Sequence, residues 1–85
     1  MWAVVCIDTY NYTNLSIKLF DDFDMATRFI RNDVEKFYRE MSEYYDNISI
    51  EANYSAGYAE MIINGKFEYI WNTDFVGDVC KNCED

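Results

Sequence analysis

Carboxylates and three cysteines are the residues of this sequence that could do chemistry, because the chain has no histidine. Histidine is the commonest general base, the usual partner of a catalytic serine or cysteine, and the commonest metal ligand. The sequence also has no glycine-rich phosphate loop and no G-x-S-x-G nucleophile motif. We therefore expect a protein that is not an enzyme and that uses no metal and no cofactor.

Two of the cysteines have the spacing of a metal or redox motif, in the segment Cys80-Lys81-Asn82-Cys83. A zinc site needs four ligands, and Cys6 is the only further thiol. A redox C-x-x-C pair normally starts a helix that follows a strand, and no helix is predicted here. We interpret the pair as part of a C-terminal tail without such a role, and Cys6 as a small buried apolar residue.

Negative charge is the strongest overall signal. Sixteen acidic and seven basic residues give a net charge of −9. Nucleic acids and anionic membranes are polyanions, so this balance argues against both as direct partners and favours a basic protein, or solubility alone. The charge is uneven, because residues 24–45 hold five acids and four bases, net −1, and the rest of the chain therefore holds −8.

The spacing of apolar residues predicts one α+β domain over residues 1–85, in the order ββαβββ, with a single amphipathic helix packed on one face of a five-stranded antiparallel sheet. Residues 24–45 have apolar side chains every three or four positions, after an aspartate-rich segment typical of a helix N-cap. The strands are predicted at residues 2–8, 15–20, 47–54, 58–63 and 66–72, followed by a tail at 73–85. We favour the strand order 2-1-5-4-3, with 2-1-3-4-5 as the alternative.

Two turn signals set the predicted faces of the last three strands. Asn64-Gly65 is typical of a two-residue type I′ hairpin, and residues 55–57 suit a three-residue loop with Gly57 in the left-handed conformation. Both turns predict the same face toward the helix, made of Ile48, Ile50, Ala52, Tyr54, Tyr58, Glu60, Ile62, Phe67, Tyr69 and Trp71. The opposite face then carries Ser49, Glu51, Asn53, Ala59, Met61, Ile63, Lys66, Glu68, Ile70 and Asn72.

Glu60 is the single charged residue on the predicted helix-side face. A buried carboxyl has a raised pKa and can act as an acid. The alternative is that it reaches the sheet margin or accepts a hydrogen bond from a nearby tyrosine hydroxyl. We favour the alternative, because one carboxylate without a partner base is not a catalytic set.

The candidate partner-binding residues combine carboxylates of the predicted helix start, sheet and tail with apolar side chains on the predicted outer face. Carboxylates beside apolar anchors suit docking onto a basic protein surface. Alternatively, the apolar side chains are covered by the C-terminal segment or form a homodimer contact. The candidates are Asp21, Asp22, Asp24, Glu51, Glu68, Asp74, Asp78, Met61, Ile63 and Ile70.

The apolar start of the chain, residues 2–7, is too short for a signal peptide or a membrane span. Three cysteines, an odd count, make a poor disulfide framework. We therefore expect a cytoplasmic protein with no membrane partner.

Small size, a one-domain α+β build, strong acidity and the absence of catalytic motifs together resemble the anti-CRISPR class of phage-encoded inhibitors. The resemblance extends over the whole chain and is one of type, because no motif carries it and no residue role is transferred. It implies an inhibitor in the host cytoplasm that mimics DNA and occludes the basic nucleic-acid channel of a defence nuclease. A structural or assembly module that self-associates through the outer sheet face, or through an open sheet edge, is the alternative.

Overall fold

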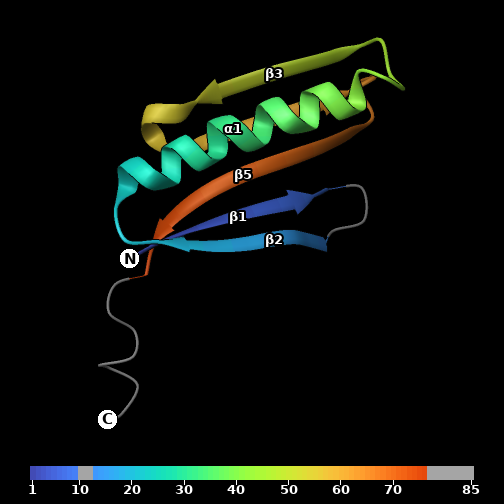
Figure 1. The fold of residues 1–85 in the computed structure, drawn as a ribbon. Coiled ribbons are helices and arrows are strands. Elements are labelled where there is room, and N and C mark those ends of the chain that lie inside the picture. The colour runs from blue at the N-terminus through green and yellow to red at the C-terminus, as the bar shows by residue number, and fades with distance from the viewer. Residues whose placement is uncertain (10–12, 77–85) are drawn as a thin grey trace.

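The computed structural model describes residues 1–9 and 13–76 of the chain, which form five strands, one α-helix and one short 3₁₀ helix (Figure 1). The elements have the predicted order ββαβββ, and the predicted α+β class is confirmed. Their bounds are β1 Trp2–Asp8, β2 Thr13–Phe20, α1 Phe23–Met41, β3 Ile48–Asn53, η1 Tyr54–Ala56, β4 Tyr58–Ile63 and β5 Phe67–Phe75.

The strands form one antiparallel sheet in the order β2-β1-β5-β4-β3, which confirms the favoured order. β5 lies in the middle and pairs with β1 on one side and β4 on the other. Trp2 pairs with Phe75, and the Val76 N–H donates to the Met1 carbonyl at 3.0 Å. β5 therefore extends into the segment predicted as a tail, and residues 77–85 lie outside the described residues.

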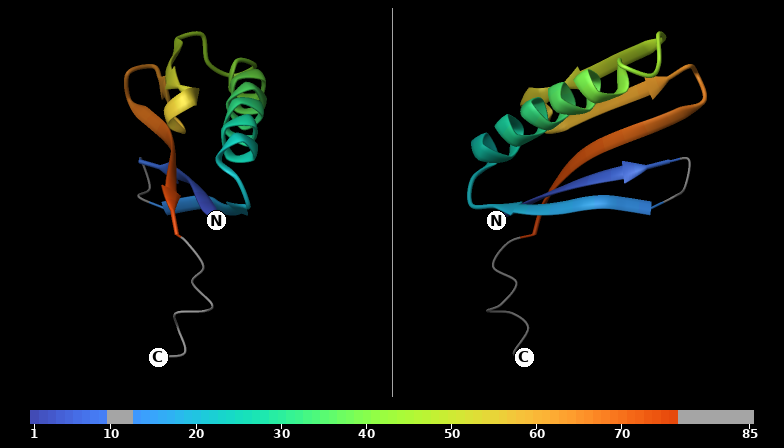
Figure 2. Two further views of the ribbon diagram at one scale, coloured as in Figure 1. Left: turned by 90° about the vertical axis from the view of Figure 1, so that its left-hand side faces the viewer. Right: turned by 45° about the vertical axis from the view of Figure 1, so that its right-hand side comes forward.

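Helix α1 begins where the aspartates predict. The Asp22 side chain is the N-cap and accepts a hydrogen bond from the Met25 N–H at 2.7 Å, which satisfies a donor that the first turn leaves unpaired. The buried side chains Ala26, Ile30 and Val34 follow at intervals of four, so one side of the helix packs on the sheet. Figure 2 shows the helix against one face of the sheet.

The predicted end of the helix at residue 45 is wrong, because α1 ends at Met41. The Ser42 N–H still donates to the Tyr38 carbonyl at 2.9 Å. The N–H groups of Tyr44 and Tyr45 both donate to the Met41 carbonyl, at 3.0 and 2.9 Å. The chain thus makes a turn there, although its tyrosines continue the apolar spacing of the helix.

Trp71 is the centre of the core between helix and sheet. Its side chain is fully buried, and its Nε1–H donates to Asp33 Oδ2 on the helix at 2.9 Å. The Phe37 ring meets the indole edge-on, with 5.2 Å between centroids. The indole therefore ties α1 to the central strand by a polar and an aromatic contact. The rest of the buried cluster is Val4, Cys6, Ala26, Ile30, Val34, Ala59, Met61 and Ile63.

The predicted faces of β3 and β5 are correct, but those of β4 are inverted. Ala59, Met61 and Ile63, predicted on the outer face, are fully buried against the helix. They pair with Ala52, Ile50 and Ile48 of β3, so the three pairs share one face. The residues that alternate with them, Tyr58, Glu60 and Ile62, therefore lie on the opposite face, and their predicted placement in the core is wrong.

Each loop beside β4 contains one residue more than predicted. Asn64 and Gly65 have the positive φ angles of a type I′ turn, but the ladder resumes with Ile63 opposite Phe67, which leaves Lys66 as an extra residue. At the other end the 3₁₀ turn η1 and Gly57 separate Asn53 from its partner Tyr58. The two shifts compensate, so only the strand between the loops is inverted.

Gly57 and Gly65 provide a matched test of this packing, because both have positive φ, at 71° and 65°. A Cβ atom at Gly57 would lie 2.8 Å from the Thr73 Cβ, whereas nothing lies within 4 Å of one at Gly65. Gly65→Ala should cost only the backbone penalty, about 1–2 kcal/mol. Gly57→Ala should lose roughly 1–3 kcal/mol more through overpacking. Urea unfolding of both variants measures the difference, and equal losses would contradict the close approach of η1 to β5.

Candidate functional site

The sheet face opposite α1, here called the outer face, is the candidate functional site. Within residues 1–9 and 13–76 no element packs over it, and Figure 2 shows the helix on the other side. The strand ladders determine which side chains share this face, because directly paired residues point the same way. The residues placed there by register are Ala3, Val5, Ile7, Ile17, Leu19, Ser49, Glu51, Asn53, Tyr58, Glu60, Ile62, Glu68, Ile70, Asn72 and Asp74.

One side of the outer face is aliphatic. We call this set the apolar half, and it comprises Ala3, Val5, Ile7, Ile17, Leu19 and Ile70. Ile17 and Leu19 on the edge strand β2 are both 58% exposed, although they alternate as regularly as core residues. Exposed β-branched and leucine side chains at adjacent positions on an uncovered sheet face are typical of a contact surface.

The other side of the outer face carries three glutamates, here called the acidic half: Glu51 on β3, Glu60 on β4 and Glu68 on β5. Glu51 and Glu60 are direct cross-strand partners, and Cβ atoms of such pairs are about 5 Å apart. Glu68 pairs with Ile62, so it lies diagonal to Glu60. Like charges at these positions repel, and no lysine or arginine side chain is among the outer-face residues that the structure describes.

A tyrosine hydroxyl orients the middle glutamate. The Tyr58 hydroxyl donates to Glu60 Oε2 at 2.6 Å. This hydrogen bond, together with partial burial and the surrounding glutamates, raises the pKa of Tyr58 to about 12. The tyrosine therefore stays protonated and keeps the Glu60 carboxylate in a defined position.

The pKa of Glu68 reflects its partial burial and the negative charges that surround it. Its pKa is raised, first by partial burial and then by the charges of Glu60 and Glu51. A carboxyl with a raised pKa in the fold contributes stability below its unfolded pKa, and that contribution is lost as pH rises through the folded pKa. The ionised acidic half thus opposes folding, the reverse of a salt-bridged carboxylate.

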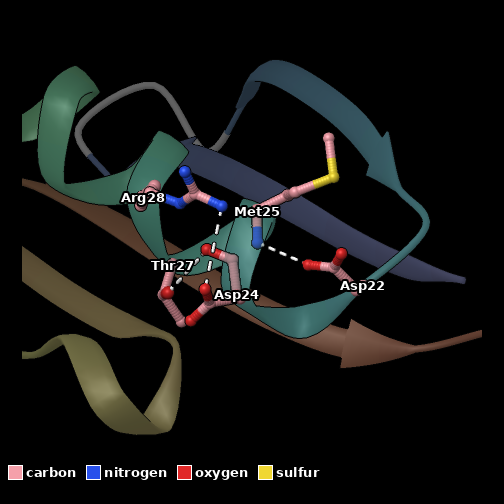
Figure 3. A network of polar contacts seen from close by, with 5 residues as sticks. All are labelled: Asp22, Asp24, Met25, Thr27 and Arg28. Carbon is pink, nitrogen blue, oxygen red and sulfur yellow. Dashed lines mark hydrogen bonds and ion pairs between the residues drawn. The ribbon is translucent and has the colours of Figure 1, made fainter.

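The predicted aspartates near the helix start do not join this face. Asp22 caps the helix, and Asp24 pairs with Arg28 at 3.7 Å on the exposed helix surface (Figure 3). Asp21 is exposed beside them. Asp74 lies on the outer face but next to Ala3, at the end of β5 remote from Glu68. Of the predicted carboxylates, the structure brings Glu51 and Glu68 together with Glu60.

The predicted apolar anchors divide between the two faces. Ile70 lies on the outer face as predicted. Met61 and Ile63 are fully buried under the helix, so their predicted place on the outer face is wrong. Asp78 lies outside the described residues.

Of the predictions for the three cysteines, the burial of Cys6 is confirmed. Cys6 is fully buried in the core, as expected. Burial, and then the nearby charges of Asp33 and Asp8, raise its pKa to about 12. The thiol therefore stays protonated and is a poor nucleophile. Cys80 and Cys83 lie outside the described residues.

Sequence reasoning missed Glu60 and Tyr58 as members of the face. The sequence did contain a signal, because Glu60 is the only charged residue of β4. If Glu60 is placed on the outer face, the residues on the helix side of the strand are Ala59, Met61 and Ile63, all of them apolar. The predicted hydrogen bond between Glu60 and a tyrosine hydroxyl is confirmed, but on the outer face.

Among the described residues, no group of three or more histidine, cysteine, aspartate or glutamate side chains has the arrangement of a metal site. No helix in the described part of the chain is both long and apolar enough to span a membrane. Compared with known proteins, the chain matches no family model, no curated sequence and no solved structure.

Glu60→Gln tests the electrostatics of the acidic half. The substitution removes one neighbouring charge from Glu68 and the ionised acceptor from Tyr58. The Glu68 pKa should fall, and the Tyr58 pKa should drop from about 12 toward 10. Carbon-detected NMR titration of the carboxyl and phenol carbons measures both values. Glu35→Gln, on the exposed helix surface, is the control and should leave both unchanged.

Proposed function

We propose that this chain is a non-enzymatic protein inhibitor whose outer face binds the basic nucleic-acid-binding surface of a host defence nuclease. The inhibitor acts in the host cytoplasm and occludes the nucleic-acid channel, in the manner of anti-CRISPR proteins that mimic DNA. The observation that carries the proposal is the acidic half: Glu51, Glu60 and Glu68 lie close together on an uncovered sheet face that has no basic side chain among its described residues.

Mutual repulsion makes the acidic half complementary to cations. Glu51 and Glu60 are opposed across the ladder, and Glu68 has a raised pKa beside them. An arginine or lysine of a partner relieves this repulsion and gains charge-assisted hydrogen bonds. Nucleic-acid-binding surfaces are rich in these two residues because they neutralise phosphates. Carboxylates at cross-strand spacing therefore compete with phosphates for the same groups.

The charge distribution of the molecule favours the outer face, rather than the helix side, as the surface that meets a cationic partner. Helix α1 carries Arg28, Arg31, Lys36 and Arg39, four of the seven basic residues of the chain. The outer face carries only acids among its described ionisable side chains, apart from Tyr58. Helix α1 also carries four acids, so its net charge is zero, whereas the described outer face is net negative, and a cationic surface is steered toward that face.

A pair of charge-reversal variants tests the proposal. Glu51→Lys with Glu68→Lys changes the outer face, and Glu35→Lys with Glu40→Lys makes the same change in net charge on exposed helix positions. DNA cleavage by a panel of RNA-guided nucleases is measured with each protein. The wild-type chain should inhibit at least one nuclease, and the outer-face variant should weaken that inhibition by about a hundredfold, because each desolvated charge pair is worth 1.5 kcal/mol or more.

The helix variant should retain inhibition within roughly threefold, since distant exposed charges are screened by salt. Raising the salt concentration should weaken the wild-type complex more than the outer-face variant's residual binding. Equal losses for the two variants would attribute the effect to net charge alone, and failure of the wild-type chain to bind any nuclease of the panel would reject the proposed function.

A further inference from the structure

Across the middle of the sheet, the outer face changes from apolar to acidic between β5 and β4. One row of cross-strand partners contains Ile7, Ile70, Glu60 and Glu51 on four successive strands. The first two side chains belong to the apolar half and the last two to the acidic half. Along this row the two kinds of surface are therefore adjacent, whereas toward the start of β5 the boundary shifts, because Glu68 lies on β5 and its partner on β4 is Ile62.

We propose that the outer face binds an amphipathic basic helix of the partner, lying along β5. Its apolar stripe packs on the apolar half, and its basic flank faces the acidic half. This inference rests on the proposed function and names the part of the partner that the face recognises. The charge of the face selects the partner, because an acidic or neutral helix would leave Glu51, Glu60 and Glu68 without cations.

The dimensions of the sheet fit one helix. Neighbouring strands are about 4.8 Å apart, so β1 and β4, on either side of β5, are separated by about 10 Å. A helix with its side chains is about 10–12 Å wide. It therefore reaches both halves at once when its axis follows β5. The opposite face of the same sheet already accommodates α1, a helix of 19 residues that contacts β1, β2 and β4.

The apolar half requires more of the partner than positive charge. Ile17 and Leu19 are each 58% exposed, and a polycation without apolar side chains leaves them in water. An amphipathic helix along β5 covers Val5 and Ile7 on the adjacent strand β1 while it pairs with the glutamates. Its contact with the apolar half should persist at salt concentrations that screen the charges.

Two synthetic peptides of identical composition test the inference. Both are 18-residue peptides of leucine and lysine; one has the leucines on one helical face, and the other has them scrambled. Fluorescence anisotropy at low and high salt measures binding to the full chain. The amphipathic peptide should bind about tenfold or more tightly than the scrambled one, because burial of a further aliphatic side chain corresponds to roughly that factor.

Three variants locate the contact. Val5→Ser with Ile7→Ser, on β1, should remove the preference for the amphipathic peptide, and Glu51→Lys with Glu68→Lys should weaken both peptides. Tyr44→Ser is the matched control, because Tyr44 is an apolar side chain that is 80% exposed outside the face, and it should change neither. Chemical-shift mapping should place the amphipathic peptide on β1, β5 and β4. Far-ultraviolet circular dichroism verifies that each variant is folded.

Equal affinity for the two peptides, or shifts confined to α1, would overturn the inference. A salt-insensitive dimer by light scattering that Ile17→Ser with Leu19→Ser converts to monomer would also overturn it, since a second copy would then occupy the face. The two proposals fail separately. Nuclease inhibition with no peptide preference leaves the function standing, whereas peptide preference without any nuclease target leaves only the inference standing.

Discussion

A single helix packed on a five-stranded sheet covers one face, and the distribution of side chains in this protein follows from that constraint. The large buried residues gather on the helix side, where Trp71 joins α1 to the central strand through Asp33 and Phe37. The apolar residues left for the other side, such as Ile17 and Leu19, have no covering element within the described residues. The core is thus packed on one face of the sheet, and the proposed binding surface lies on the other.

The acidic half shows that the outer face is not optimised for stability alone. A sheet gains from opposite charges at cross-strand positions, and Glu51 facing Glu60 does the reverse. The fold tolerates the repulsion between these carboxylates because the three glutamates remain partly solvated, and because the Tyr58 hydroxyl donates a hydrogen bond to Glu60. Arrangements that oppose folding are common where a surface is shaped for a partner.

Sequence periodicity predicted the fold well, because helix and strand spacing depend on local patterns. The Asp22 cap, the buried spacing of Ala26, Ile30 and Val34, and the central place of β5 could all be anticipated. The faces of β4 could not be obtained from turn signals, since one additional loop residue inverts a strand. Agreement between the two predicted registers was misleading because both errors acted on the same strand. The candidate site was therefore only half predicted: Glu51, Glu68 and Ile70 were placed correctly, and Glu60 and Tyr58 were not.

The place of β5 in the sheet has a consequence for biogenesis. β5 is the last strand of the described residues, yet it lies between β1 and β4. The β1–β2 and β3–β4 hairpins share no ladder among the described residues until β5 inserts between them. During translation each hairpin keeps an exposed edge until β5 has left the ribosome, so completion of the sheet depends on a late, long-range pairing.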